Sequence, residues 1–470
     1  MGRRGSFVKQ GCPSCHTFSI KIPALETPET PPARSVSSLA VEGKPVDCGG
    51  RDHAMSTGNS TLSNTVAVAV SGGVDSLCAL VMLQQAGYSV LALHGLFLPD
   101  AAPEPPPGLA AACAALGVPL HVADLRPVFE REVLAPFAAA YAAGRTPNPC
   151  ALCNRAIKFG ALFDAAMGLG AQRLATGHYA RLAAAPEDAV TALLPEGLDP
   201  AASRDNARIS AVDNGCGCTE GRHGVSGAHP PLLAAAHDAA KDQSYFLSLV
   251  PRERLARACF PLAEQDKARS REIVARAGLA VPVPNESQDI CFAPVVSGAA
   301  TAGLAAADAY RPFLERRWQK AALVPPGPGP VFLRDAAGGL REIARHKGLW
   351  RYTEGQRKGL GIAHSEPLYV LAKDGTANAL VVGPRALLGV TRCLTGAANV
   401  SLPQQYWTGE LLVRLRHRQK PSPAVVTLDA SGRLDICFAE PQFPSAPGQV
   451  AAVYDGRGHV LAAGIVETMT

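Results

Sequence analysis

The clearest chemical signal in the chain is a turn with the sequence Ser-Gly-Gly-Val-Asp-Ser at residues 71–76. It follows the apolar run Val66–Val70, which is typical of a strand buried on both faces of a parallel sheet. Glycines let backbone N–H groups approach an anion closely, and the start of a following helix adds partial positive charge. Two serine hydroxyls supply further donors, and the Asp75 carboxylate suits a magnesium ion. We therefore expect a phosphate-binding turn rather than a plain serine-capped connection.

Cysteines supply the second chemical signal. The chain has 13 of them, an odd number, and no apolar segment follows the basic residues at its start. Neither a disulfide framework nor a secretory signal is therefore expected, and thiols in a reducing compartment serve catalysis or metal binding. Cys150 and Cys153 lie around a predicted helix start, and Cys291 lies in the segment Ser287–Phe292. For any one cysteine taken alone, a small buried hydrophobic residue is the alternative.

Alternating strands and helices indicate what positions these residues. Predicted strands are residues 65–70, 88–98, 120–123 and 173–176. Predicted helices are residues 77–87, 109–116, 127–143, 155–167, 243–249 and 270–277. The alternation implies right-handed crossovers and an α/β fold with a doubly wound parallel sheet.

Composition divides the remainder of the chain. Residues 1–62 show no sustained periodicity and are expected to be a disordered extension, unless translation begins at Met55, and residues 183–238 are expected to be a disordered insertion. We expect a catalytic domain at 63–255, a small central domain at 256–365 and a C-terminal antiparallel β-barrel at 366–470. The first two barrel strands would be Leu368–Leu371 and Ala379–Val382. An uninterrupted apolar run of about 18 residues is missing, so no membrane span is expected.

Basic residues gather in two places. Residues 311–358 contain 11 Lys and Arg against 4 Asp and Glu, a net of +7 in a chain whose total is +5. The interleaved Trp318, Trp350 and Tyr352 suit a surface that follows nucleic-acid phosphates and stacks on bases, and a solvated charged face is the alternative. The second cluster, on a predicted barrel strand, would share one face or form an exposed edge: Arg414, Arg416, Arg418 and Lys420.

The turn at 71–76 resembles the PP-loop of the ATP pyrophosphatases, enzymes that adenylate a carbonyl or carboxyl oxygen and release pyrophosphate. It does not have the Gly-x-x-x-x-Gly-Lys pattern of loops that hold a γ-phosphate. Five further motifs follow in order: Gly144–Asn154, Thr176–Tyr179, Lys241–Leu247, Ser287–Phe292 and Gly355–Gly361. With them, the chain from about Val66 to its C-terminus resembles the tRNA-specific 2-thiouridylase family, whose members put sulfur on the wobble uridine of tRNA.

The resemblance implies where ATP, with Mg²⁺, and tRNA would bind. ATP would contact the turn and two later residues, of which Leu98 lines the adenine pocket and Gly177 closes it: Ala69, Val70, Ser71, Gly72, Gly73, Val74, Asp75, Ser76, Leu98 and Gly177. The target base would contact Asn148, Pro149 and Cys150. The remaining tRNA contacts would be His178, Lys241, Asp242, Gln243, Arg416, His417 and Gln449.

The resemblance also assigns Cys153 as the nucleophile and Cys291 as the carrier of a persulfide. The chemistry is coherent, because the uracil C2 oxygen becomes a good leaving group once AMP is attached to it. A sulfur nucleophile then adds at C2, and AMP departs. A thiolate is needed, and a position near a helix N-terminus would lower the pKa of Cys153. Attack by the persulfide or by freed hydrosulfide ends in a Cys153–Cys291 disulfide, which must be reduced for turnover.

One position departs from the family's pattern. Cys150 stands where the best-known members have an aspartate, three residues before the first catalytic cysteine. Cys150, Cys153 and Cys291 would then supply three thiolates to a [4Fe–4S] cluster, and its open iron would bind hydrosulfide. Related thiolation enzymes use such clusters. This cluster is the alternative to persulfide chemistry.

The expected partners follow from the same resemblance. They are tRNAs for lysine, glutamate and glutamine, together with a cysteine desulfurase or a sulfur relay protein, in the cytoplasm. Two other functions stay open: a PP-loop enzyme that adenylates a small molecule, and a non-enzymatic RNA-binding protein that kept a nucleotide site. The paired cysteines and the basic region argue against the first, and the intact turn with both cysteines argues against the second.

Overall fold

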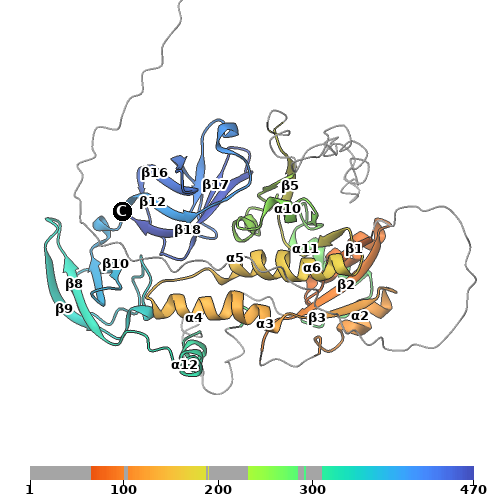
Figure 1. Cartoon of the computed structure of the whole chain (residues 1–470), viewed down its shortest axis with the longest axis horizontal. Helices are drawn as coiled ribbons and strands as arrows, with labels where there is room; N and C mark the ends of the chain where they lie inside the picture. Colours follow the sequence, from red (N-terminus) through yellow and green to blue (C-terminus); the bar gives the residue numbers. More distant parts are fainter. Residues whose placement is uncertain (1–64, 100–103, 187–188, 190–230, 284–289, 293–309) are drawn as a thin grey trace, which may run out of the picture. The chain divides into compact units, whose positions relative to one another are not determined.

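The computed structural model describes residues 65–99, 104–186, 189, 231–283, 290–292 and 310–470. The N-terminal extension, with Met55, and most of the predicted insertion lie outside the described residues. Figure 1 shows the described chain as a parallel-sheet domain in orange, yellow and green, a central sheet in teal and a barrel in blue. Within the described residues, no helix is both long and apolar enough to cross a membrane.

A five-stranded parallel sheet forms the first domain. Its strands, in spatial order, are β3 (Leu120–Asp124), β2 (Ser89–Leu96), β1 (Thr65–Ala69), β4 (Arg173–Ala175) and β7 (Ala258–Cys259). From β1 the chain first adds strands on one side and then crosses to add β4 on the other. This arrangement confirms the predicted doubly wound sheet. Ligands of such sheets bind where the strand order reverses, which is here at the carboxyl ends of β1 and β4.

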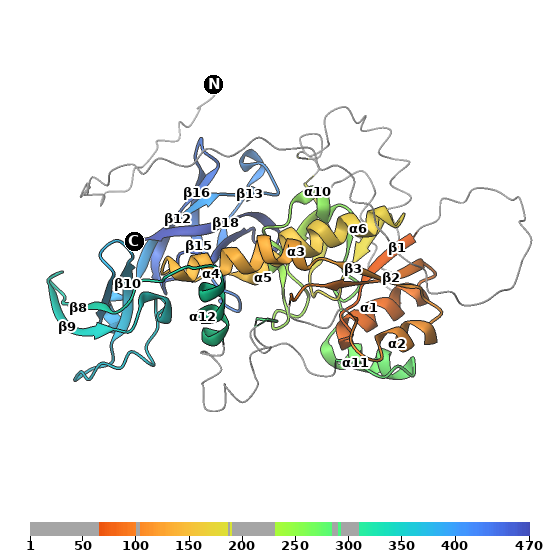
Figure 2. The ribbon, with the colours of Figure 1, turned by 60° about the horizontal axis from the view of Figure 1, so that its bottom comes forward.

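Helices cover both faces of this sheet (Figure 2). The side chains of Val66 and Val68 pack with the helices of one face: α1 (Val74–Gln85), α2 (Leu109–Ala115) and α11 (Lys267–Arg276). Ala67, Leu91 and Leu93 pack on the other: α3 (Arg126–Phe129), α4 (Ala135–Ala142), α5 (Pro149–Cys153) and α6 (Leu162–Gly168), with the π-helical segments η1 (Glu130–Leu134) and η2 (Asn154–Ala161). The alternation of β1 residues between two apolar layers explains its continuous apolar sequence.

The helix that carries the first cysteines begins earlier than the sequence predicted. The prediction placed its start at Arg155, whereas α5 begins at Pro149. The Asn148 side chain accepts a hydrogen bond from the Ala151 N–H at 3.1 Å, which caps the helix. Asparagine at the cap followed by proline in the first turn is a strong start signal, which the prediction did not use.

The ends of the predicted insertion are ordered. β5 (Arg181–Ala184) pairs antiparallel with β6 (Pro231–Ala234), so disorder is the wrong prediction for these residues. Two short helices follow, α9 (Ser244–Leu247) and α10 (Arg252–Leu255). The described residues after α10 include the single-turn 3₁₀ helices η7 (Leu349–Arg351), η8 (Arg385–Leu387) and η9 (Gln404–Tyr406).

The central part consists of helix α12 (Arg311–Lys320) and a four-stranded sheet. The sheet order is β10 (Tyr369–Asp374), β11 (Ala379–Gly383), β8 (Gly329–Arg334) and β9 (Leu340–His346). The assignment of Leu368–Leu371 and Ala379–Val382 to the barrel is therefore wrong, because these runs pair within this sheet. The aromatic residues expected to stack on bases are instead core residues: Trp318, Trp350 and Tyr352 are at most 6% exposed.

The C-terminal part is a closed antiparallel barrel. Its strands, in order, are β12 (Val390–Ala397), β16 (Arg433–Gln442), β15 (Ser422–Leu428), β14 (Leu412–Arg414), β17 (Val450–Tyr454) and β18 (Val460–Met469), with β13 (Asn399–Val400) added to β18. Pairing of β12 with β18 closes the barrel, which confirms the predicted architecture. The four basic residues from Arg414 do not share a strand face, because β14 ends at Arg414 and Arg418 has a φ of 64°.

A buried ion pair joins the barrel to the parallel-sheet domain. The Arg414 guanidinium lies 2.6 Å from an Asp242 oxygen, and the two side chains are 13% and 1% exposed. Asp242 also accepts hydrogen bonds from the N–H groups of Ala236 and Ser244 and from the Ser244 hydroxyl. Such a buried pair is stable only while both charges are present.

Replacing Arg414 with alanine is expected to lower the free energy of unfolding by about 3–5 kcal/mol, because the Asp242 carboxylate would stay buried without its charged partner. Urea unfolding measures the change. The matched control is Arg276→Ala, which removes an exposed i,i+4 pair with Glu272 and is expected to cost no more than about 0.5 kcal/mol. Equal effects of the two substitutions would contradict this role of Arg414.

A candidate nucleotide site beside three cysteines

A cavity of about 520 Å³ lies at the carboxyl ends of β1 and β4, where the strand order reverses. Eight of the predicted ATP contacts line it: Ala69, Val70, Ser71, Gly73, Val74, Asp75, Ser76 and Gly177. The two others do not. Gly72 has a φ of 85°, which glycine adopts readily in a tight turn. Its carbonyl accepts a hydrogen bond from the Val283 N–H at 3.0 Å.

The predicted adenine contact at Leu98 stays a prediction. Leu98 does not line the cavity, whereas Phe97 does, together with His94 and Gly95. Strand β2 ends at Leu96, so the alternation of a strand no longer decides which later side chain faces the cavity. The Nδ1–H of His94 donates to the Val70 carbonyl at 2.7 Å, and burial lowers the pKa of the ring.

The turn itself leaves backbone donors available to an anion. The Ser76 hydroxyl donates to the Gly73 carbonyl at 2.9 Å, and the Ser71 N–H donates to the Ser76 oxygen at 3.2 Å. Gly73 occupies the cap position of α1 and brings no side chain to the first-turn N–H groups. The start of α1 therefore presents N–H groups and partial positive charge toward the cavity, as an anion-binding helix start does.

The cavity wall is strongly basic. The basic residues that line it are Lys158, Lys241, Lys267 and Arg271, against the single carboxylate of Asp75. The Lys267 ammonium lies 2.8 Å from both Asp75 oxygens, and the Tyr179 hydroxyl donates to one of them at 2.8 Å. This balance of charge suits a polyphosphate. Asp75 is 33% exposed and fits a Mg²⁺ ion whose other ligands are phosphate oxygens and waters.

Gly177 holds the two halves of the site together. A Cβ atom at this position would lie 2.8 Å from the Asp75 carbonyl carbon and 2.9 Å from the Ser76 nitrogen. The chain after β4 thus packs directly against the backbone at the start of α1. Any side chain here would push the phosphate-binding turn away from the opposite wall of the cavity.

Three of the residues assigned to tRNA lie on the cavity wall instead of an open surface: His178, Lys241 and Gln243. The Gln243 side chain accepts a hydrogen bond from the Tyr179 N–H at 2.9 Å. His178 is 8% exposed and lies 2.8 Å from the Thr176 hydroxyl and 3.2 Å from the Lys158 ammonium. Burial, with the charge of Lys158, lowers the pKa of His178 well below its usual value, so the ring is neutral.

The remaining tRNA assignments lie where the barrel meets the loop before α5. The buried Asp242 side chain is fully occupied by the ion pair with Arg414, which does not fit a direct contact with tRNA. Gln449 donates to the Thr146 and Pro147 carbonyls at 2.9 and 3.1 Å, and Arg416 donates to the Glu354 carbonyl at 2.9 Å. The His417 ring lies 4.4 Å from the Phe246 ring, measured between centroids. Half-buried Arg416, His417 and Gln449 stay predicted contacts.

Cys150, Cys153 and Cys291 lie close enough for their charges to interact, and the charge of Lys158, a residue of the cavity wall, acts on all three. Cys153 is the last residue of α5, so it does not lie at the helix start. Burial raises the pKa of Cys153 to about 12, against the opposing effect of the Lys158 charge. The predicted lowering is therefore wrong for the chain alone: desolvation outweighs both the helix and the lysine. Burial likewise raises the pKa of Cys150.

These thiols do not form a metal site in the described part of the chain. All three are reduced, and among the described residues there is no group of three Cys, His, Asp or Glu side chains placed to hold a metal ion. The [4Fe–4S] cluster is thus not shown among the described residues and stays the alternative prediction. Elsewhere in the described chain, Cys78, Cys113 and Cys393 are buried, Cys259 is half-buried and Cys437 is exposed.

Comparison with known proteins matches these domains in order. The chain matches the tRNA methyl transferase HUP domain at residues 64–207 and 220–295, the tRNA methyl transferase PRC-barrel domain at 324–384 and the aminomethyltransferase beta-barrel domain at 393–466. It is 44% identical to the tRNA-specific 2-thiouridylase MnmA of Nitratidesulfovibrio vulgaris (strain Miyazaki F), over 85% of this chain and 98% of that protein. The chain belongs to the tRNA-specific 2-thiouridylase family.

Two further relatives carry the same name. The MnmA of Oleidesulfovibrio alaskensis is 43% identical, over 86% of this chain and 99% of that protein. The MnmA of Lawsonia intracellularis is 40% identical, over 85% of this chain and 98% of that protein. The resemblance seen in the short motifs therefore extends over the 2-thiouridylase domains as a whole.

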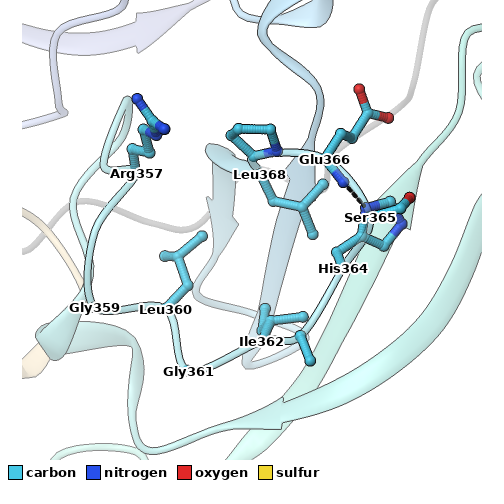
Figure 3. A pocket seen from close by; sticks show the side chains of 11 residues that line it. Arg357, Gly359, Leu360, Gly361, Ile362, His364, Ser365, Glu366 and Leu368 are labelled. Carbon is cyan, nitrogen blue, oxygen red and sulfur yellow. Dashed lines mark hydrogen bonds between the residues drawn. The ribbon is translucent and has the colours of Figure 1, made fainter.

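The last motif of the 2-thiouridylase resemblance forms a loop of its own in the central domain. A shallow cavity of about 630 Å³ is lined by residues of a single segment, 357–368 (Figure 3). The side chains of Leu360, Ile362 and Leu368 pack together inside the loop, and Arg357 is exposed at its start. The neighbouring Lys358 is also exposed. This loop thus displays basic side chains on an apolar support.

Sequence reasoning missed several residues of the site. Lys267 and Arg271 come from α11, and Lys158 comes from η2. No motif marks them, since each looks like an ordinary charged residue on a helix surface. These three residues reach the cavity because the sheet brings helices from distant parts of the sequence around it.

Proposed function

We propose that this chain catalyses the ATP-dependent 2-thiolation of the wobble uridine of tRNA. The observation that carries the proposal concerns Lys158. This residue lines the basic cavity that contains the PP-loop, and its charge acts on all three thiols. A base activated in such a cavity would meet a sulfur nucleophile without leaving the site. Family membership supports the same reaction through the names of the relatives.

The first step would be adenylation. The C2 oxygen of uracil attacks the α-phosphorus of ATP, the bond to the bridging oxygen breaks, and pyrophosphate leaves while the base loses its N3 proton. Mg²⁺ supplies charge neutralisation on the phosphates when it is bound, and Asp75 would hold it. The N–H groups at the start of α1 and the lysines of the wall would bind the phosphates.

The second step would be sulfur transfer. The terminal sulfur of a Cys291 persulfide bonds to C2, and the C2–O bond breaks as AMP leaves. The Cys153 thiolate then bonds to the Cys291 Sγ, the old S–S bond breaks, and its electron pair stays on the sulfur at C2. The base regains its N3 proton. A Cys153–Cys291 disulfide remains, which a thiol reductant must open for turnover.

Incubation of the protein with ATP, Mg²⁺, a persulfide donor and unmodified tRNA tests this function. Nucleoside analysis of the tRNA should detect 2-thiouridine, and its formation should require each of the four components. Pyrophosphate release that does not depend on tRNA would favour an adenylase of small molecules. No release under any condition would favour a non-enzymatic RNA-binding protein. Either result would overturn the proposal.

Separate measurements identify the finer partners. Transcripts of the lysine, glutamate and glutamine tRNAs are the expected substrates, compared with a transcript that lacks uridine at the wobble position. The expected sulfur donor is a cysteine desulfurase or a relay protein that carries a persulfide. A route through a [4Fe–4S] cluster requires iron, so anaerobic purification followed by iron and sulfide analysis tests that alternative: the persulfide route predicts no iron.

The basic loop at 357–368 is expected to contact the phosphates of tRNA. Replacing Arg357 and Lys358 together with alanine should weaken tRNA binding and lower the slope of log affinity against log salt by about 1 for each phosphate that is no longer neutralised. The control is Arg131→Ala, an arginine that is 66% exposed and lies on η1. Unchanged affinity and slope in the double variant would contradict the predicted role of this loop.

A further inference from the structure

Lys158 lies on the same helical rod as two of the cysteines. The rod begins as α5, which carries Cys150 and Cys153, and continues without a break into the π-helical segment η2. Hydrogen bonds in a π-helix run from residue i to residue i+5, so residues five apart lie near one another along the helix. Lys158 is five residues after Cys153. The wide turn therefore brings the lysine back to the side that carries the thiols.

Lys158 also belongs to the cavity wall. Its side chain lines the cavity together with Ser71 and Asp75 of the phosphate-binding turn. Among the charges that act on Cys150, Cys153 and Cys291, it is the cation common to all three thiols. The lysine thus stands between the phosphates of a bound nucleotide and the sulfur atoms.

A hydrogen bond holds the ammonium in this place. A lysine ammonium has three donors and no acceptor, so it donates to His178 Nε2, which lies 3.2 Å away. The proton of the imidazole is then on Nδ1, from which it donates to the Thr176 hydroxyl at 2.8 Å. Burial keeps His178 neutral by lowering its pKa, so it takes the hydrogen bond without competing for the positive charge. Two ammonium donors remain for a ligand.

We propose that Lys158 is a further catalytic residue of this site. Its ammonium would bind the phosphate of the adenylated uridine and would stabilise the anionic sulfur on Cys291 and Cys153 while sulfur is transferred. This inference rests on the proposed function. It assigns a single cation to both halves of the reaction. AMP leaves with a new negative charge while a sulfur anion must be present, and Lys158 would stabilise the phosphate and the sulfur alike.

The first test is independent of the thiolation reaction. Iodoacetamide alkylates the thiolate, so below a pKa of about 12 the alkylation rate of Cys153 should rise about tenfold per pH unit, without a plateau between pH 7 and 10. Replacing Lys158 with methionine should slow this alkylation about tenfold at each pH, because loss of the cation raises the pKa further. Peptide mass spectrometry measures the rate at Cys153 itself.

Three variants separate charge from structure. Lys158→Met should lower the rate of thiolation about 100-fold while tRNA binding is unchanged. Lys158→Arg keeps the charge and should recover most of the alkylation rate and part of the thiolation rate. Lys241→Met removes another lysine of the cavity wall and should leave the alkylation of Cys153 within about twofold of the unmodified chain.

Two results would overturn the inference. One is a Lys158→Met variant in which the alkylation rate of Cys153 and the rate of tRNA thiolation both stay within twofold of those of the unmodified chain. The other is a Lys158→Arg variant that keeps its melting temperature and is as slow as Lys158→Met, since the charge would then not be what matters. Failure of the proposed function looks different, because the unmodified chain itself would then form no 2-thiouridine.

Discussion

Replacing Cys291 with serine is expected to abolish 2-thiouridine formation, by about three orders of magnitude or more, as the loss of a catalytic nucleophile does. Binding of tRNA should be unchanged, because Cys291 is exposed and packs no core. Pyrophosphate release in a single turnover should also continue, since adenylation precedes the step that uses sulfur. Quenched-flow measurement of pyrophosphate and of 2-thiouridine in the same samples separates the two steps.

Cys153→Ser should fail at a later point. The Cys291 persulfide can still add to C2, but no thiolate opens the S–S bond, so tRNA should accumulate as a covalent adduct with Cys291 that a thiol reductant releases. The matched control is Cys437→Ser, which changes an exposed cysteine on β16 of the barrel. Full thiolation by Cys291→Ser, or loss of tRNA binding, would refute the assigned role.

Gly177→Ala is expected to reduce tRNA-dependent pyrophosphate release about 100-fold, because a displacement of catalytic groups by about 1 Å has effects of that size. The new methyl carbon would lie 2.8 Å from the Asp75 backbone, closer than carbon atoms approach one another. The atoms that the methyl group would meet belong to the backbone of Asp75 and Ser76, which cannot rotate aside as a side chain can. The phosphate-binding turn therefore has to move. Isothermal titration with a non-hydrolysable ATP analogue would report the same damage as weaker binding.

A second glycine in the same domain provides the control. Gly168, the last residue of α6, has open space around the position that a Cβ would take. Gly168→Ala should therefore leave pyrophosphate release and ATP affinity unchanged. If Gly177→Ala behaves like Gly168→Ala in both measurements, the close approach of β4 to α1 does not shape the site.

The fold was predictable where local sequence and tertiary position agree. The turn at 71–76 must sit between a buried strand and a helix, and its neighbours Val66 and Leu77 pack as such a unit requires. The fold explains why residue 177 is glycine, since a Cβ there would meet the Asp75 backbone. The family resemblance had already marked Gly177 as a residue of the site. The adenine contact of Leu98 stays a prediction, because Leu98 follows the end of β2, where strand alternation does not decide which side chain faces the cavity.

The electrostatics of the site could not be predicted from sequence. A pKa depends on burial and on nearby charges, and the raised pKa of Cys153 comes first from desolvation by burial. The same holds for Arg414, which seemed to belong to an exposed basic face and instead pairs with Asp242 of another domain. Thiolate formation at Cys153 therefore depends on the cation of Lys158 and on what binds in the cavity.

The central claim is that the cavity and the cysteine pair act on one uridine in one reaction sequence. A single-turnover experiment tests it most directly: chain loaded with persulfide at Cys291, ATP, Mg²⁺ and unmodified tRNA, without a reductant. Pyrophosphate, 2-thiouridine and the Cys153–Cys291 disulfide peptide should form in equal amounts. Formation of 2-thiouridine without that disulfide, or without an equivalent of pyrophosphate, would contradict the account.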